Sequence, residues 1–264
     1  MNKYFGILKT SIKQEQKLMG NTLLAMFSFC VIIVIFNQLW KYIYSNNIGG
    51  IINGYSLDMM LWYLIMAETL TYCLNSKGVT KSFAGEIKTG KIAYSLNKPY
   101  NYYFYQIVTT IGYSVWKMLF LIPTALIIGF ILLGGVSTFN FWHLIPFIFS
   151  IFLSCLLSTF IYGTIGLLAF WIEEPTPFTW IVQKFVLLLG LFFPPEFFPS
   201  WLQPVINYSP IYAMMSGPCK LFADFSWELF SKVLLSQAVY LFIFCIIGLV
   251  IYNFGIKKVN INGG

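Results

Sequence analysis

The chain has 264 residues, of which 58% are hydrophobic and 9% are charged. Soluble domains are about 45–50% apolar and about 25% charged, so the composition excludes an ordinary soluble domain and predicts a polytopic membrane protein. All sixteen basic residues behind the net charge of +7 are lysines. The absence of arginine argues against a nucleic-acid partner.

Cysteine and histidine give no sign of a metal site. The five cysteines show no CxxC pair, and four of them lie in apolar runs, where cysteine packs as a small hydrophobe. The single histidine, His143, follows Trp142 near an expected membrane interface, so neither a zinc site nor a Ser-His arrangement is predicted. We therefore expect no catalytic residue, no metal and no cofactor bound directly by this chain.

The first half of the chain starts with an amphipathic segment, followed by two apolar runs. In residues 1–21, apolar side chains fall near one helical stripe (Phe5, Leu8, Ile12 and Met19). This pattern predicts a helix on the cytoplasmic membrane surface, and a plain basic tail is the alternative. The first two spans are predicted at residues 22–44 and 57–74, joined by uncharged, turn-forming residues.

A polar stretch, residues 77–99, follows the second apolar run and holds five lysines and one glutamate. Because lysine is retained on the cytoplasmic side of a membrane, this stretch is predicted to be a cytoplasmic loop or interfacial helix. Within it, GEIKTGK at 85–91 matches the first seven positions of a phosphate-binding loop. Ile92 then stands where magnesium coordination requires Ser or Thr, which excludes such a loop. We expect a cytosolic partner to bind here instead.

Four more spans are predicted in the rest of the chain. The third ends near Leu133, at a Gly134–Gly135 turn, and the others are expected at residues 141–171, from 178 to the helix breakers Pro194–Pro195, and at 232–254. Six spans would place both termini on the cytoplasmic side together with the polar stretch. The predicted fold class is an all-α integral membrane protein with one transmembrane domain, residues 1–264.

Residues 192–218 are too apolar for a free external loop and too broken for a straight span. They carry six prolines, many aromatic residues and one charge. Irregular backbone at membrane depth is stable where it is buried in protein or lines an aqueous cavity. We expect re-entrant or interfacial helices on the external side that form a gate, marked by Pro194, Pro195, Glu196, Pro199 and Pro210.

Three ionisable residues fall inside the predicted spans: Glu68, Lys117 and Lys184. A charge costs about 2.5–3.5 kcal/mol at the centre of a membrane helix, so each needs a partner or water. Lys184 is close enough to the start of its span for its side chain to reach the interface. For Glu68 we expect an ion pair with Lys117 that joins spans two and three, and a substrate or proton site is the alternative.

Two local patterns give the chain a family resemblance. The first is FAGEIKTGKI at 83–92 followed by LNKP at 96–99, which is similar to an I-x-x-G…L-x-x-P stretch. The second is FPSWL at 198–202, followed by Pro204 and by NYSP at 207–210. In this order they resemble the permease subunits of type 2 ABC exporters. In that family the first pattern docks on the ATPase, and the second forms re-entrant helices between spans five and six.

The resemblance implies a function and a set of partners. Two permeases, identical or related, would form a path across a bacterial cytoplasmic membrane, surrounded by lipid and driven by cytosolic ATPases that hold ATP and magnesium. The docking residues would be Gly85, Glu86, Lys88, Gly90, Lys91 and Pro99, with the two glycines ending short helical pieces and Pro99 stopping the segment.

The sequence leaves two alternatives, one for the partner of Glu86 and one for the function. Glu86 is expected either to contact the ATPase or to form an ordinary ion pair with Lys81 or Lys91. A self-contained secondary carrier or channel is the alternative function, although a carrier would more often show internal repeats, and none is evident.

Overall fold

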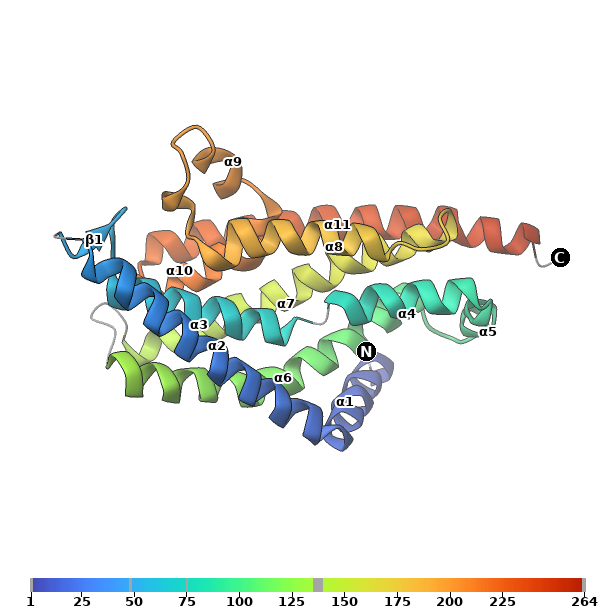
Figure 1. Ribbon diagram of the computed structural model, residues 1–264. Coiled ribbons are helices and arrows are strands. Elements are labelled where there is room, and N and C mark those ends of the chain that lie inside the picture. The colour runs from blue at the N-terminus through green and yellow to red at the C-terminus, as the bar shows by residue number, and fades with distance from the viewer. Residues whose placement is uncertain (1, 48, 75, 135–139, 263–264) are drawn as a thin grey trace.

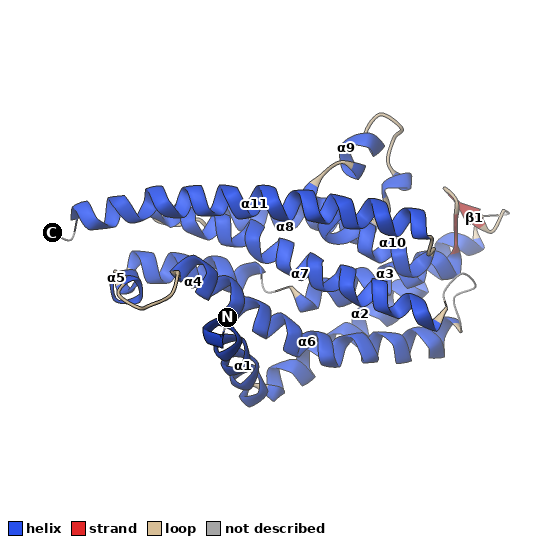
Figure 2. Ribbon diagram, turned by 180° about the vertical axis from the view of Figure 1, so that it is seen from behind, coloured by secondary structure: helices blue, strands red, loops and turns tan. Residues whose placement is uncertain are grey.

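The computed structural model describes residues 2–47, 49–74, 76–134 and 140–262 and shows long helices that run side by side (Figure 1). Five helical segments are long and apolar enough to cross a membrane: Met19–Ser45, Leu57–Lys88, Tyr102–Leu133, Phe141–Phe170 and Trp227–Lys258. The second of them consists of two successive helices, the first of which ends at Cys73. Another apolar helix, Thr176–Phe192, is shorter. Across the described ranges the strands are confined to one short hairpin (Figure 2), so the fold is that of an all-helical membrane protein.

The described elements of the first half are, in order, α1 (Asn2–Lys17), α2 (Met19–Ser45), β1 (Ile51–Ile52), β2 (Tyr55–Ser56), α3 (Leu57–Cys73), α4 (Ser76–Lys88), α5 (Lys91–Leu96) and α6 (Tyr102–Leu133). Strands β1 and β2 pair antiparallel. Their turn residues Asn53 and Gly54 both have positive φ, as a two-residue hairpin turn requires.

The second half contains several short helical pieces between its long helices. In order, the elements are η1 (Phe141–His143), α7 (Leu144–Leu167), η2 (Leu168–Phe170), α8 (Thr176–Val186), the π-helix η3 (Leu187–Phe192), η4 (Pro195–Phe197), α9 (Gln203–Asn207), the π-helix η5 (Tyr212–Ser216), α10 (Gly217–Ala223) and α11 (Trp227–Asn262).

The bundle has two different ends (Figures 1 and 2). We call the end that carries α4, α5 and the C-terminal part of α11 the basic end, because Lys88, Lys91, Lys257 and Lys258 belong to these elements. We call the opposite end, with β1, β2 and α10, the hairpin end. Helix α1 crosses α6 in the half of the bundle nearer the basic end (Figure 1).

Helix α1 packs against α6. Ser11 is almost fully buried beside Gly112, and the Tyr113 hydroxyl donates a hydrogen bond to Gln14 Oε1 (3.1 Å). A break at Leu18 separates α1 from α2. The helix expected within residues 1–21 is present, and its position on a membrane surface stays a prediction.

Near the hairpin end the core is built around Trp62 of α3, which is fully buried. The centre of its ring lies 5.3 Å from that of Phe130 on α6 and 4.8 Å from that of Phe222 on α10. Aromatic pairs at such distances add about 0.5–1.5 kcal/mol beyond the burial of their surface. These contacts hold α10 inside the bundle.

Most helix boundaries lie within a few residues of the predicted spans. Helix α11 is the main exception, because it runs from Trp227 to Asn262 rather than from about Lys232 to Phe254. Ser226 precedes it, and its hydroxyl accepts a hydrogen bond from the Leu229 amide (3.1 Å), which caps the helix start. Gly135, one half of the predicted turn after α6, lies outside the described residues.

Candidate functional site

The polar stretch between α3 and α6 is folded into helices. Val79 and Phe83, on one side of α4, are buried, and the helix packs on α7 beside Gly166. A Cβ built on Gly166 would lie 2.8 Å from the Phe83 Cβ, so the absence of a side chain there permits this approach. On the other side of α4, Lys81 and Lys88 are exposed. Helix α4 is therefore amphipathic, with a basic face that the bundle does not cover.

Glu86 is the centre of a polar network that joins three helices. Its Oε1 accepts a hydrogen bond from Gln106 Nε2 on α6 (2.7 Å), and its Oε2 accepts one from Ser95 Oγ on α5 (3.2 Å). Gln106 Nε2 also donates to the Tyr102 hydroxyl (3.1 Å), and Gln106 Oε1 accepts from Ser82 Oγ on α4 (2.9 Å). Hydrogen bonds to a carboxylate are stronger than neutral ones. The network therefore fixes α4, α5 and the first turns of α6 to one another.

This arrangement differs from the ion pair that the sequence left open for Glu86. Among the described residues, the two ion pairs lie elsewhere, and Lys81 and Lys91 are exposed. Neutral donors on α5 and α6 occupy both carboxylate oxygens instead. Glu86 itself is half-buried. Its contact with an ATPase stays a prediction.

The two glycines of the stretch have different roles. Gly90 lies between α4 and α5 with a φ of +71°, a left-handed conformation that glycine adopts without strain. It ends a helical piece, as expected. Gly85 lies inside α4, where the Thr89 amide donates to its carbonyl (3.1 Å) and continues the helical pattern. The prediction that Gly85 ends a helix is therefore wrong.

The loop after α5 contacts the start of α1. Lys3 Nζ donates a hydrogen bond to the Pro99 carbonyl (3.3 Å), and the Asn101 amide donates to the Tyr4 hydroxyl (3.3 Å). Asn101 also caps α6, because its Oδ1 accepts from the Phe104 amide (3.3 Å). Pro99 lies between α5 and α6 and outside both. The first residues of α1 thus meet the α4–α5 stretch where α6 begins.

Aromatic and basic groups gather on the exposed side of α5. Tyr94 is 74% exposed, and Lys98 Nζ lies 5.0 Å from the centre of its ring and 5.9 Å from that of Tyr100. Lys88 and Lys91 are exposed nearby in sequence. Aromatic and cationic side chains of this kind are well suited to a protein partner that offers acidic groups.

The three charges expected inside the spans lie in different surroundings. Glu68 is 6% exposed on α3, Lys117 is half-buried on α6, and Lys184 is exposed on α8. The ion pairs of the described residues are Lys220–Glu196 and Lys232–Glu228, so the predicted Glu68–Lys117 pair is wrong within this subunit. Lys117 keeps part of its long side chain exposed, as flexible lysines in spans commonly do, whereas Glu68 is buried.

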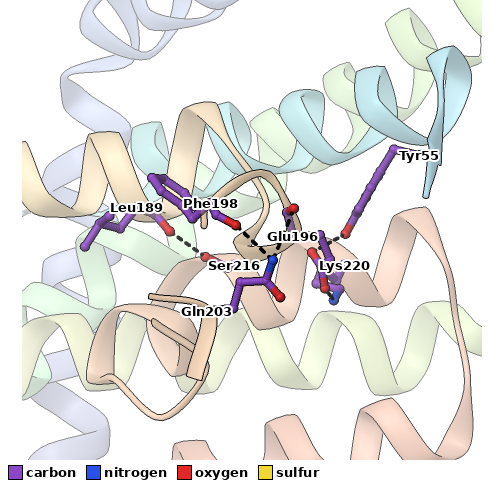
Figure 3. A network of polar contacts seen from close by, with 7 residues as sticks. All are labelled: Tyr55, Leu189, Glu196, Phe198, Gln203, Ser216 and Lys220. Carbon is purple, nitrogen blue, oxygen red and sulfur yellow. Dashed lines mark hydrogen bonds and ion pairs between the residues drawn. The ribbon is translucent and has the colours of Figure 1, made fainter. Parts of the chain in front are cut away.

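Near the hairpin end, Glu196 joins segments that lie far apart in the sequence (Figure 3). It forms an ion pair with Lys220 of α10 and accepts a hydrogen bond from the Tyr55 hydroxyl of β2 (3.1 Å). Gln203 Nε2 of α9 donates to the Phe198 carbonyl (2.9 Å). Burial, together with the nearby Glu196 charge, raises the pKa of Tyr55 well above its ordinary value. Tyr55 therefore stays protonated and keeps donating at neutral pH.

The segment expected at 192–218 consists of short helical pieces in two positions. Helix α9 protrudes from the side of the bundle (Figure 1), whereas η5 and α10 turn back into it and are largely buried. Ser216 Oγ donates to the Leu189 carbonyl (3.2 Å) and so fastens η5 to η3 (Figure 3). Of the four prolines expected to mark the gate, Pro194 and Pro195 are buried, Pro210 is half-buried and Pro199 is exposed. The role of this segment as a gate stays a prediction.

A comparison with known protein families identifies the family of this chain. The family described as ABC-2 family transporter protein matches residues 24–263. The chain belongs to this family. It is therefore a multi-pass membrane permease of an ABC transporter, a transport component that is not itself catalytic. A search of curated proteins found no match.

Gln237 of the permease is a structural residue that the sequence analysis missed. It is fully buried in α11, and its Nε2 donates to the Ala213 carbonyl of η5 (3.1 Å) and to Ser154 Oγ of α7 (3.0 Å). It thereby links the returning helix η5 to two long helices. One signal was available, because a glutamine within an apolar run needs a partner inside the protein.

The described part of the permease contains no cluster of three or more His, Cys, Asp or Glu side chains that could bind a metal ion. Its polar networks instead join helices to one another. The lysines of α4 and α5 remain exposed outside these networks.

Proposed function

We propose that this ABC-2 permease is a membrane subunit of an ATP-driven exporter and that cytosolic ATPases bind it at α4 and α5. The observation that carries the proposal is the Glu86 network, which fixes α4 and α5 to the first turns of α6. A displacement of α5 by an ATPase would reach α6 through these bonds. ATP and magnesium would be held by the ATPase, as is typical of partners of this family.

In this proposal the basic end faces the cytoplasm of a bacterial cell. The lysines of α4 and α5 favour that orientation, because positive charge is retained on the cytoplasmic side. Six spans follow if Thr176–Phe192 crosses the membrane with the five long helices. With 17 residues this segment is at the lower end of the range of about 17–25 residues that spans a bilayer as a helix. Both termini then lie in the cytoplasm.

Helix α1 would act together with the docking helices. Its residues Lys3 and Tyr4 contact Pro99 and Asn101, and its remaining length packs on α6. Movement of α4 and α5 would therefore change the position of α1 as well. Helix α6 is thus contacted both by α4, through Glu86, and by α1. Through these two contacts an ATPase bound at α4 and α5 would control the opening of the path.

A second permease, identical or related, would complete the path. Large apolar side chains remain exposed on α2 and α8, among them Phe27 (68%), Ile35 (58%), Ile181 (55%) and Phe185 (53%). Such surfaces are stable against lipid or against another membrane subunit. We place the second permease and the surrounding lipid on these faces.

Purification of the tagged chain from its native membrane tests the proposal. We expect a cytosolic ATPase to accompany the unaltered permease and to be lost from a Lys88→Glu, Lys91→Glu variant, because both lysines are exposed on the docking helices. A Lys257→Glu, Lys258→Glu variant has the same change of charge on α11 and should retain the ATPase. A stable preparation of the unaltered chain without any ATPase would contradict the proposal and favour a self-contained carrier or channel.

A further inference from the structure

A groove of about 670 Å³ runs between α8–η3 on one side and the junction of α3 with α4 on the other. Helix α8 lines it with Trp180, Lys184 and Leu187, and η3 continues the same face with Leu191. These positions recur at helical spacing, so they form one continuous stripe along the groove. Met215 of η5 lines it as well.

Hydrogen bonds between helices hold the walls in position. Thr179 Oγ1 of α8 donates to Thr80 Oγ1 of α4 (3.0 Å), and Thr80 Oγ1 donates to the Tyr162 carbonyl of α7 (3.0 Å). All three residues are buried, and Tyr162 also lines the groove. The spacing of α4 and α8 is thus set by the fold, and the groove is a formed feature of the bundle.

The groove is basic toward one end and apolar toward the other. Lys77 and Lys184 supply its charge, and none of its described lining residues is acidic. Helix α8 runs from the basic end toward the hairpin end (Figure 1), and Lys184 lies in its last turn, before Leu187 and Leu191. Leu187, Leu191 and Met215 line the groove farther from the basic end. The groove therefore combines a cationic part with an apolar part along its length.

A second groove, of about 600 Å³, differs from the first because its lysines are paired with carboxylates of the same chain. It lies between α9, α10 and α11 and also contains two lysines, Lys220 and Lys232. These lysines pair with Glu196 and Glu228, so their charge is balanced within the chain. Over the described residues, neither Lys77 nor Lys184 forms an ion pair.

We propose that the groove along α8 binds an anionic amphiphile, with its negative group at Lys77 and Lys184 and its chain along Leu187, Leu191 and Met215. An anion there would supply the opposite charge that a lysine on a membrane helix needs. Apolar walls gain about 25 cal/mol for each Å² of chain surface removed from water. This inference names the class of cargo for the exporter proposed above and rests on that function.

Binding of hexadecyl phosphate to the full chain in phosphatidylcholine nanodiscs tests the inference, with empty nanodiscs as background. A Lys77→Gln, Lys184→Gln variant should weaken this binding about tenfold or more, the loss expected for charge-assisted bonds worth about 1.5–3 kcal/mol. A Lys257→Gln, Lys258→Gln variant removes the same charge from α11 and should bind as the unaltered chain does. Hexadecyltrimethylammonium, with the same chain and the opposite charge, should bind at least about tenfold more weakly.

Competition then identifies the source of the anion. Displacement of the probe by phosphatidylglycerol in the nanodisc would indicate a membrane lipid, and displacement by water-borne alkyl phosphates alone would indicate a soluble amphiphile; either result supports the proposal. Displacement by inorganic phosphate at the same concentration would overturn it, because the apolar walls would then contribute nothing. Equal binding of both probe charges, or no effect of the lysine changes, would also overturn it.

The same preparations separate this inference from the proposed function. A Lys184→Gln variant, which is changed outside α4 and α5, should retain its ATPase while binding the probe more weakly. An unaltered chain that binds the probe selectively but carries no ATPase would contradict the exporter alone. A chain that carries the ATPase but does not discriminate between the probes would contradict the cargo class alone.

Discussion

Glu86 receives hydrogen bonds from residues nine and twenty positions further along the chain, Ser95 and Gln106. A carboxylate with several lysines near it in the sequence would ordinarily be expected to form an ion pair with one of them. No periodic pattern in the sequence indicates Ser95 and Gln106 as its partners instead. In the structure Glu86 holds α4, α5 and α6 together, and its contact with an ATPase stays a prediction. An effect of its mutation on ATPase binding would therefore act partly through α5.

Glu86→Ala should loosen α5 while leaving the long helices intact. It removes an acceptor shared by α5 and α6 and leaves Gln106 with fewer partners, which typically costs about 1–3 kcal/mol. Hydrogen exchange of residues 91–98 should accelerate. Lys88→Ala, an exposed change two residues away, should leave this exchange unaltered. Equal exchange in the two variants would contradict the role assigned to the network.

Tyr55 should make the stability of the folded protein depend on pH in the alkaline range. Its pKa is raised in the folded state, so above a pH of about 10 the folded protein holds a proton that the unfolded chain has lost. Stability should then fall as pH rises, by up to about 1.4 kcal/mol per pH unit for this group. Thermal unfolding between a pH of about 9 and about 11 should show a smaller fall in Tyr55→Phe. Identical slopes would show that Tyr55 does not contribute.

At the scale of elements, the apolar runs predicted the long helices because a span needs about 20 apolar residues in succession. Short re-entrant or interfacial helices could be predicted for the broken region after α8, but not which of them return into the bundle. Pro194 and Pro195 end the apolar run, whereas the return of α10 depends on contacts of Phe222 with Trp62, from a helix far away in the sequence. The start of α11 was also set by a local cap at Ser226 rather than by hydropathy.

The contact of α4 with α7 should depend on Gly166. Gly166→Ala would place a Cβ 2.8 Å from Phe83 and 3.1 Å from the Thr80 backbone, so α4 must shift, at a cost of about 1–3 kcal/mol. Gly85→Ala is the matched control, because a Cβ there meets nothing within 4 Å and alanine favours a helix by about 1 kcal/mol. Thermal unfolding should show a lower midpoint for the first variant and an equal or higher one for the second. The opposite order would contradict the packing of α4 described above.

At the scale of the whole molecule, helices connect the two ends of the bundle. Helices α4 and α5 connect to α6 at the basic end, and α6 extends to the contact of Phe130 with Trp62 near the hairpin end. Composition predicted a polytopic membrane protein, and the resemblance of residues 83–99 and 198–210 implied a permease, which the family match confirms. The partners of Glu86 and Gln237 could not be predicted, because they are set by how helices distant in sequence pack.

The most direct test of this account is a photo-crosslink in the intact complex. A benzoylphenylalanine placed at Lys91 on the docking helices should capture the ATPase. The same group placed at Trp201, which is 73% exposed beside α9, should not capture it, because in the proposed orientation this residue lies on the other side of the membrane. An ATPase adduct at Trp201, or none at Lys91 in a complex that still hydrolyses ATP, would contradict docking at α4 and α5.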